Sequence, residues 1–388
     1  MPKEKLLLIP GPTPVRKRIL DALAAPTVAH TGPEMQADLS EACTDLKRIV
    51  FCEKGEAFIV AGAGTLSMEM AVLNTAAPNG RALVLSQGYF GARMAEILRA
   101  FGLPHDIVEA EWGRAVLPGE LEGRLAADPY DTVICTHVDT ATGACAPVEE
   151  YARAAKAHGA LFIVDGVCAT GGIAERMDEW TIDVVLTAAQ KCIGVPPGLA
   201  LCVFSQRAMA RRRALSSIPA YYSDVLRWLP VMRSPAKYFS TPCVNEIRAF
   251  REGTRIILEE GLEARFRRHE LQARAIRAGL KSLGFTFFTA PAFMASTLSV
   301  VAYPDGVDDK AFRAALDGRG VVVAGGLAAT AGKVFRMGHM GNLTGDDVLF
   351  AVEAAEGVLG SLGAPVDRGA AVRAAAAVLD GGTGGARA

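Results

Sequence analysis

The sequence has no long apolar run and no excess of charge of one sign. No stretch approaches the roughly 18 uncharged apolar residues that a membrane-spanning helix needs. The apolar run near the N-terminus is interrupted by Pro10, Gly11 and Pro12, so it is too short for the core of a signal peptide. The 41 basic and 42 acidic residues give a formal charge of -1, which provides no general attraction to nucleic acid or to an anionic membrane. We therefore expect a soluble, cytoplasmic protein that binds neither.

Patterns of metal and nucleotide sites are also missing. There is no C-x-x-C motif and no histidine spaced as a zinc partner, so we expect no metal site and reduced thiols that mainly fill the core. The glycine-rich segment 61–70 lacks the third glycine of a dinucleotide fingerprint, and residues 325–334 have the wrong spacing for a P-loop. The eight cysteines are Cys43, Cys52, Cys135, Cys145, Cys168, Cys192, Cys202 and Cys243.

Short apolar runs alternate with helical patterns through the first part of the chain. The runs are nearly continuous in apolar residues, which is typical of strands that helices cover on both faces. This alternation predicts a three-layer α/β domain with a mainly parallel sheet. The expected strands are residues 56–62, 81–87, 131–138, 160–166, 182–189 and 198–205, and the expected helices include 65–76, 90–101 and 148–158.

The pattern changes after about residue 245. One long amphipathic segment indicates a helix, or two in succession, that leads into a smaller α+β domain. Because 388 residues exceed what one compact core usually organises, two domains are expected. We divide the chain into an N-terminal segment at the active site (1–20), a large domain (21–255), a small domain (256–365) and a flexible, glycine-rich tail (366–388).

Three segments place reactive residues at loop positions where ligands bind in α/β folds. Gly64 and Thr65 begin a helix, where free N–H groups favour an anion, although a plain tight turn fits as well. Asp165 ends an apolar strand, where a half-buried carboxylate needs a cation or a hydrogen-bonded cap. Lys191 follows another strand in a mostly apolar segment, which suits Schiff-base chemistry but also an ordinary solvated loop.

Further motifs share the order found in one protein family. The sequence resembles the class V aminotransferases, above all their alanine–glyoxylate and serine–pyruvate group, within the fold type I pyridoxal-phosphate enzymes. The motifs are PGPTPV (10–15), AGAGTLSMEM (61–70), THVDTATG (136–143), VDGVCATGG (164–172), AAQKCIGVPPGLA (188–200), YFSTP (238–242), EEGLEARFRRH (259–269) and GKVFRMGHMG (332–341).

The resemblance implies a cofactor and a role for each matching residue. Pyridoxal 5′-phosphate would be held by Lys191 as a Schiff base, and Asp165 would pair with its pyridinium nitrogen. Arg336 would bind the substrate α-carboxylate through its planar fork. Phe90 would stack on the ring, Thr140 would approach the cofactor's oxygen, Gly11 would border the substrate pocket, and the phosphate would meet Ala63, Gly64, Thr65 and Gln190.

Two positions imply a second subunit, and two others depart from the residues usual in the family. Tyr238 and Thr241 match residues that reach the phosphate of a partner subunit, which implies a homodimer with shared active sites. Ala63 stands where relatives often have serine, so one hydroxyl donor to the phosphate is missing. Phe90 replaces the tryptophan of some relatives and offers a smaller stacking surface. His30 and His339 are candidates for tuning substrate choice or for purely structural roles.

The implied reaction is transamination between alanine or serine and a 2-oxo acid, glyoxylate or pyruvate, with ping-pong kinetics. The alternatives on the same fold are another amine substrate, such as an aminophosphonate or a ureido amino acid, or a lyase reaction. A cysteine desulfurase is disfavoured because it needs a nucleophilic cysteine late in the chain, and none follows Cys243. A binding protein without turnover would be expected to lack Lys191, Asp165 or Arg336.

Overall fold

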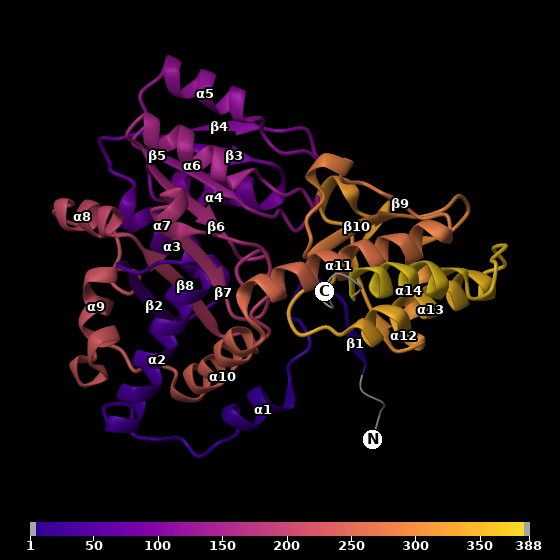
Figure 1. The fold of residues 1–388 in the computed structure, drawn as a ribbon. Helices are drawn as coiled ribbons and strands as arrows, with labels where there is room; N and C mark the ends of the chain where they lie inside the picture. The colour runs from indigo at the N-terminus through magenta and orange to yellow at the C-terminus, as the bar shows by residue number, and fades with distance from the viewer. Residues whose placement is uncertain (1–4, 384–388) are drawn as a thin grey trace.

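The apolar runs form the strands of a seven-stranded sheet in the computed structural model, which describes residues 5–383 (Figure 1). Six of these strands run in one direction, and β8 runs antiparallel to both of its neighbours. The inner strands are buried along their whole length, which explains why their sequences do not alternate. The strand order is β2 (Glu56–Ala61), β8 (Leu199–Phe204), β7 (Val184–Ala188), β6 (Leu161–Asp165), β5 (Thr132–Thr136), β3 (Ala82–Ser86) and β4 (His105–Glu109).

Helices cover both faces of this sheet. α4 (Tyr89–Ala100) connects β3 to β4, and α6 (Val148–Ala157) connects β5 to β6 in the opposite direction across the sheet. Right-handed crossovers therefore place these two helices on opposite faces. The three-layer α/β prediction is confirmed. The other helices of this part are α1 (Lys17–Leu23), α2 (Pro33–Ile49), α3 (Gly64–Thr75), α5 (Pro118–Ala127), α7 (Met177–Trp180), α8 (Gln206–Ala214), α9 (Val225–Arg233) and α10 (Val244–Glu260), with a 3-10 turn at Pro235–Lys237.

A second hydrophobic core follows Gly261, which separates α10 from α11 (Leu262–Ser282). It lies between helices and a four-stranded antiparallel sheet of order β12-β13-β10-β9, which is the expected smaller α+β unit. The N-terminal strand β1 (Leu6–Leu7) pairs with β11 and so joins this unit. The remaining elements are β9 (Thr286–Phe287), β10 (Leu298–Ala302), α12 (Asp309–Gly318), β11 (Val321–Val322), β12 (Ala324–Gly325), β13 (Val334–Gly338) and α13 (Gly345–Ser361), with 3-10 turns at Pro291–Phe293 and Ala328–Thr330.

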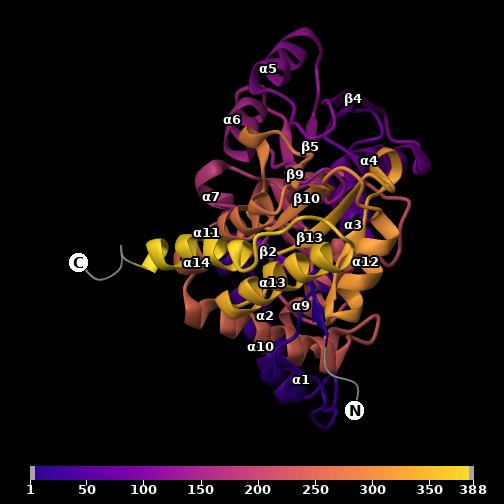
Figure 2. The ribbon, with the colours of Figure 1, turned by 90° about the vertical axis from the view of Figure 1, so that its right-hand side faces the viewer.

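The predicted flexible tail is wrong for much of its length. Residues Ala370–Thr383 form α14, which packs beside α11 and α13 (Figure 2). Ala371 and Ala375 lie one helical turn apart and are fully buried in the second core, so small apolar side chains fix this helix by tertiary packing. The prediction rested on the glycines near the end of the chain and overlooked the alanines that form the buried face of this helix. The predicted tail residues 384–388 lie outside the described residues.

None of the helices within residues 5–383 is both long enough and apolar enough to cross a membrane.

Candidate active site

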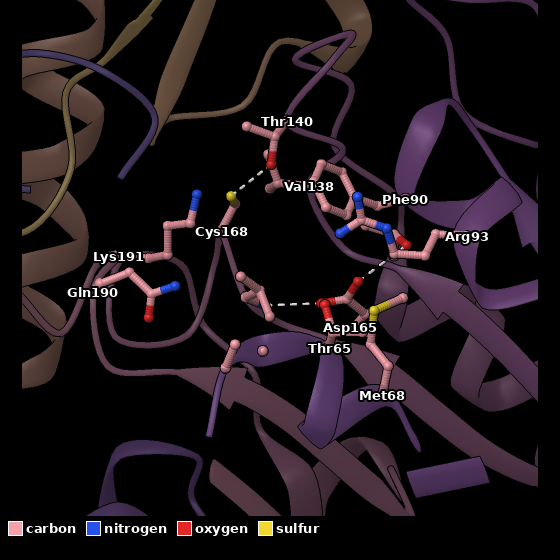
Figure 3. A pocket seen from close by; sticks show the side chains of 14 residues that line it. Thr65, Met68, Phe90, Arg93, Val138, Thr140, Asp165, Cys168, Gln190 and Lys191 are labelled. Carbon is pink, nitrogen blue, oxygen red and sulfur yellow. Dashed lines mark hydrogen bonds between the residues drawn. The ribbon is translucent and has the colours of Figure 1, made fainter. Parts of the chain in front are cut away.

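A cavity of about 220 Å³ opens where β5, β6 and β7 end (Figure 3). Parallel strands present their carboxyl ends at one edge of a sheet, so loops from distant parts of the chain meet there. Most of the residues predicted to hold the cofactor line this cavity. The lining is Ala63, Gly64, Thr65, Met68, Phe90, Arg93, Thr136, Val138, Thr140, Asp165, Val167, Cys168, Gln190 and Lys191.

One wall of the cavity is suited to an anion. Ala63 precedes α3 with an extended backbone and no side-chain cap, so the N–H groups of Gly64 and Thr65 start the helix without intrahelical acceptors. A Cβ on Gly64 would lie 3.3 Å from Val167 Cγ2, which shows how closely this turn packs on the loop after β6. The side-chain oxygen of Gln190 is buried with no hydrogen-bond partner among residues 5–383. This unsatisfied oxygen is an acceptor in the cavity lining, so it has room for a hydrogen-bond donor.

Asp165 ends β6 and is only 2% exposed. One carboxylate oxygen accepts the Val167 N–H at 3.0 Å, and the other accepts the Thr136 hydroxyl at 3.4 Å. No basic side chain of residues 5–383 lies in ion-pair contact with it. Burial raises the pKa of Asp165 to about 6, with a further contribution from the negative charges of Asp139 and Glu175. A cationic group in the cavity would offset this desolvation.

Lys191 follows β7, and its side chain contacts the N-terminal segment of the chain. Its amine donates to the carbonyl oxygen of Pro10. A Cβ on Gly11 would lie 2.3 Å from Lys191 Cδ, and Gly11 has a φ of +85°, so only glycine fits here. Thr13 also holds this loop, because its N–H donates to the backbone carbonyl of Gln190 at 3.1 Å and its hydroxyl donates to the Lys191 carbonyl at 2.9 Å. The structure thus brings Gly11 against the predicted reactive lysine.

Phe90 supplies an aromatic wall from the first turn of α4. Its N–H donates to an Asp139 carboxylate oxygen at 2.8 Å, which fixes the start of the helix. The Arg93 guanidinium lies 4.7 Å from the Phe90 ring centre. Sequence reasoning missed Arg93, although its spacing of three residues from Phe90 places both on one helix face.

Thr140 and Cys168 form another part of the wall. The Thr140 hydroxyl oxygen and the Cys168 sulfur are 2.8 Å apart. Sequence reasoning missed Cys168 as well, because it was interpreted as a core cysteine. Cys168 lies two residues after Gly166, where the loop begins. Only the fold turns its thiol toward the cavity. Sequence reasoning also missed four other residues of the lining, which are Met68, Thr136, Val138 and Val167.

Arg336 lies beside the cavity rather than in its lining. It projects from β13, donating through Nε to the Gly325 carbonyl at 2.8 Å and through Nη1 to the Thr140 carbonyl at 3.4 Å. Burial lowers the pKa of this guanidinium, and the nearby Cys168 and Asp139 oppose that effect. The structure therefore places one nitrogen of the planar fork next to the Thr140 carbonyl.

Other predicted residues lie away from this chain's cavity. Tyr238 is 50% exposed and its ring meets His30 edge-on at 4.7 Å between centroids, and Thr241 is also exposed. His339 is fully buried, 2.9 Å from the Ser299 hydroxyl and 3.0 Å from the Ser296 carbonyl. Burial lowers the pKa of His339 to about 3, so a neutral, structural imidazole accounts for it.

The cavity fits pyridoxal 5′-phosphate. The buried Asp165 carboxylate, which has no cationic partner among residues 5–383, and the free N–H groups that begin α3 match a ring that is positive at its nitrogen and carries a phosphate. Once bound, this cofactor supplies an electron sink for bonds at the substrate α-carbon. The chain itself then needs an amine to carry the cofactor and move protons, and Lys191 is the amine in the lining.

Comparison with known proteins agrees with this chemistry. The family model for "Aminotransferase class-V" matches residues 17–344. The L-aspartate–glyoxylate aminotransferase of Paracoccus denitrificans is 33% identical, covering 97% of this chain and 96% of the relative. Alanine–glyoxylate aminotransferase 1 of Saccharomyces cerevisiae is 34% identical, covering 86% of this chain and 91% of the relative.

Solved structures extend the agreement to three dimensions. The crystal structure of ureidoglycine–glyoxylate aminotransferase from Bacillus subtilis has a TM-score of 0.94 at 28% identity, covering 98% of this chain and 99% of that one. The likeness therefore spans both hydrophobic cores and the segments that line the cavity. From its sequence, its fold and this cavity, the chain belongs to the class V aminotransferases, whose cofactor is pyridoxal 5′-phosphate.

Proposed function

We propose that this aminotransferase exchanges the amino group between a small amino acid, alanine or serine, and a short 2-oxo acid, glyoxylate or pyruvate. The observation that carries the proposal is the small space around Lys191. Pro10 and Gly11 lie directly over its side chain, which leaves little room for a bulky substrate. Arg93, the cationic side chain of the lining besides Lys191, lies across the cavity beside Phe90 (Figure 3).

Substrate orientation in this proposal depends on Arg336. A guanidinium binds a carboxylate through two parallel hydrogen bonds. The contacts of Arg336 to Gly325 and Thr140 fix its plane before a substrate arrives. A substrate α-carboxylate held there would direct its amino or oxo group toward the cavity. The Lys191 amine would then take a proton from the α-carbon and deliver it to the cofactor's C4′ within the same half-reaction, and the second half-reaction would run this transfer in reverse.

Asp165 keeps the cofactor ring protonated in this scheme. The carboxylate is desolvated in the protein alone, so pairing with the ring nitrogen is favourable for both groups. Phe90 would stack on one face of the cofactor ring and so restrict how the ring is oriented. The start of α3 and Gln190 would hold the phosphate. Donor and acceptor share one site, which gives ping-pong kinetics.

Half-reaction spectroscopy tests the proposal. Single amino acids are mixed with the holoenzyme, and loss of the Lys191-bound chromophore is followed. Alanine or serine should convert it, and glyoxylate or pyruvate should restore it. Conversion by aspartate alone, or by a ureido amino acid alone, would reassign the substrate class. Inertness to every amino acid would refute the transamination scheme.

We further propose that the enzyme is a homodimer in which Tyr238 and Thr241 complete the partner's phosphate site. Support comes from their exposure on a chain whose own cavity does not include them. Mixing separately inactive Lys191→Ala and Tyr238→Ala proteins tests this. Heterodimers contain one site with both native residues, so activity should reappear on subunit exchange. Mixed proteins that exchange subunits yet stay inactive would place Tyr238 outside a shared site.

A further inference from the structure

Arg265 is a fully buried arginine outside the cavity. It lies in the first turns of α11, and its side chain has no exposed surface. Its guanidinium makes four polar contacts. Nε donates to the Gly171 carbonyl at 2.7 Å, Nη2 donates to the Cys192 carbonyl at 2.6 Å and the Gly341 carbonyl at 3.2 Å, and Nη1 donates to Glu260 at 2.7 Å.

The three carbonyl groups belong to segments that carry the proposed reactive side chains. Gly171 is on the loop that follows Asp165, Cys192 directly follows Lys191, and Gly341 is on the loop that follows Arg336. The planar guanidinium of Arg265 therefore joins the three segments by hydrogen bonds without lining the cavity itself. A guanidinium suits this task because its N–H groups point in fixed directions.

Two successive carbonyl groups at Lys191 and Cys192 each accept a side-chain hydrogen bond. Thr13 donates its hydroxyl to the Lys191 carbonyl at 2.9 Å. A Cβ on Gly341 would lie 3.1 Å from the same carbonyl oxygen, so the two loops are in direct contact. Arg265 donates to the next carbonyl along the chain, that of Cys192. Without the guanidinium, the Gly171 and Cys192 carbonyls would lose a buried donor, and the loops would be expected to shift.

We propose that Arg265 is a positioning residue that keeps the Lys191 amine in register with Asp165 and Arg336. The inference rests on the roles proposed above for those three residues. It makes the small unit's helix α11 part of the catalytic machinery, because α11 sets the distance between the lysine and the carboxylate-binding arginine. Misplacement of a reacting group by about 1 Å can reduce a rate by about 100-fold.

Arg268 provides a matched control on the same helix. It shares the acid partner Glu260, at 2.6 Å, and donates to the small unit's Gly341 and Leu343 carbonyls, both at 3.0 Å. It has no hydrogen bond to Gly171 or Cys192. Loss of Arg268 thus removes a similar cation from α11 and leaves the contacts to the Lys191 and Asp165 loops in place.

The test compares R265M, R265K and R268M holoenzymes in single-turnover half-reactions with the amino acid that converts the native enzyme. R265M should lower the limiting rate constant by about 10- to 100-fold, with the substrate dissociation constant within about threefold of native. The pH at which the Lys191-bound chromophore titrates should also move. R268M should keep the native limiting rate within about threefold, and R265K should recover part of the loss because its ammonium still reaches one carbonyl.

Three results would overturn the inference: a native limiting rate in R265M, an equal loss in R268M, or a loss in R265M that appears only in substrate affinity. If R265M does not fold, R265K decides, since a native limiting rate in R265K contradicts the proposal and a reduced rate with native substrate affinity supports it. Failure of the native enzyme to react with any amino acid is a different outcome, because it refutes the proposed function instead.

Discussion

Replacement of Asp165 by asparagine should stabilise the cofactor-free protein and abolish its chemistry. The side chain is 2% exposed and its only described partners are the Val167 N–H and the Thr136 hydroxyl. Burial raises its pKa from 3.8 to about 6. For a carboxyl group with a raised folded-state pKa, stability is fully present below the unfolded-state value and is lost as the pH rises between about 4 and 6.

The size of this effect follows from the pKa shift. A shift of about two units corresponds to about 3 kcal/mol in the free energy of unfolding above pH 6. With about 2.1 cal/mol/K of unfolding entropy per residue over 388 residues, this amounts to about 4 °C in the melting temperature. The neutral, isosteric Asp165→Asn side chain avoids this penalty and can still accept the Val167 N–H.

Thermal melts of cofactor-free native and Asp165→Asn proteins from pH 4 to pH 8 measure the effect. The variant should melt about 4 °C higher near pH 8, and the difference should vanish near pH 4. Asp305→Asn, at an exposed position, serves as the control and should change neither. The variant should also lose the amino-acid half-reaction, because a neutral amide does not hold a protonated ring nitrogen. Equal melting curves at every pH, or a native half-reaction rate, would refute the reasoning.

Three other substitutions test single contacts. Lys191→Ala should abolish the borohydride-trappable cofactor adduct seen by mass spectrometry, whereas the exposed Lys333→Ala should retain it; an intact adduct in the first would move the role to another lysine. Gly11→Ala should reduce turnover at least about 10-fold, since its Cβ would clash with Lys191, while Gly102→Ala, with a similar positive φ and open space, should keep native turnover; equal rates would contradict the clash. Arg336→Lys should raise the KM for the amino acid by about 10- to 100-fold, equivalent to about 1–3 kcal/mol of charged hydrogen bonding; an unchanged KM would exclude it as the carboxylate site.

Local patterns predicted the elements well where the chain is strongly periodic. The continuous apolar runs around Asp165 and Lys191 became buried strands, because full burial selects apolar residues at every position. The sequence also left two options for the long segment after residue 245, and Gly261 separates it into α10 and α11. The tail was mispredicted because α14 depends on packing against α11 and α13, which no local pattern reveals.

The sequence by itself determined the class of chemistry, because a lysine, a strand-ending carboxylate and a small-residue helix start in the right order carry the reactive groups. The tertiary structure alone decided which side chains meet. Arg93 and Cys168 line the cavity and Tyr238 does not, because the path of the backbone decides which side chains reach it. Arg265 contacts carbonyls 94 and 73 residues away along the chain. Such contacts depend on the sum of many packing interactions across two cores, so neither spacing nor residue type can encode them locally.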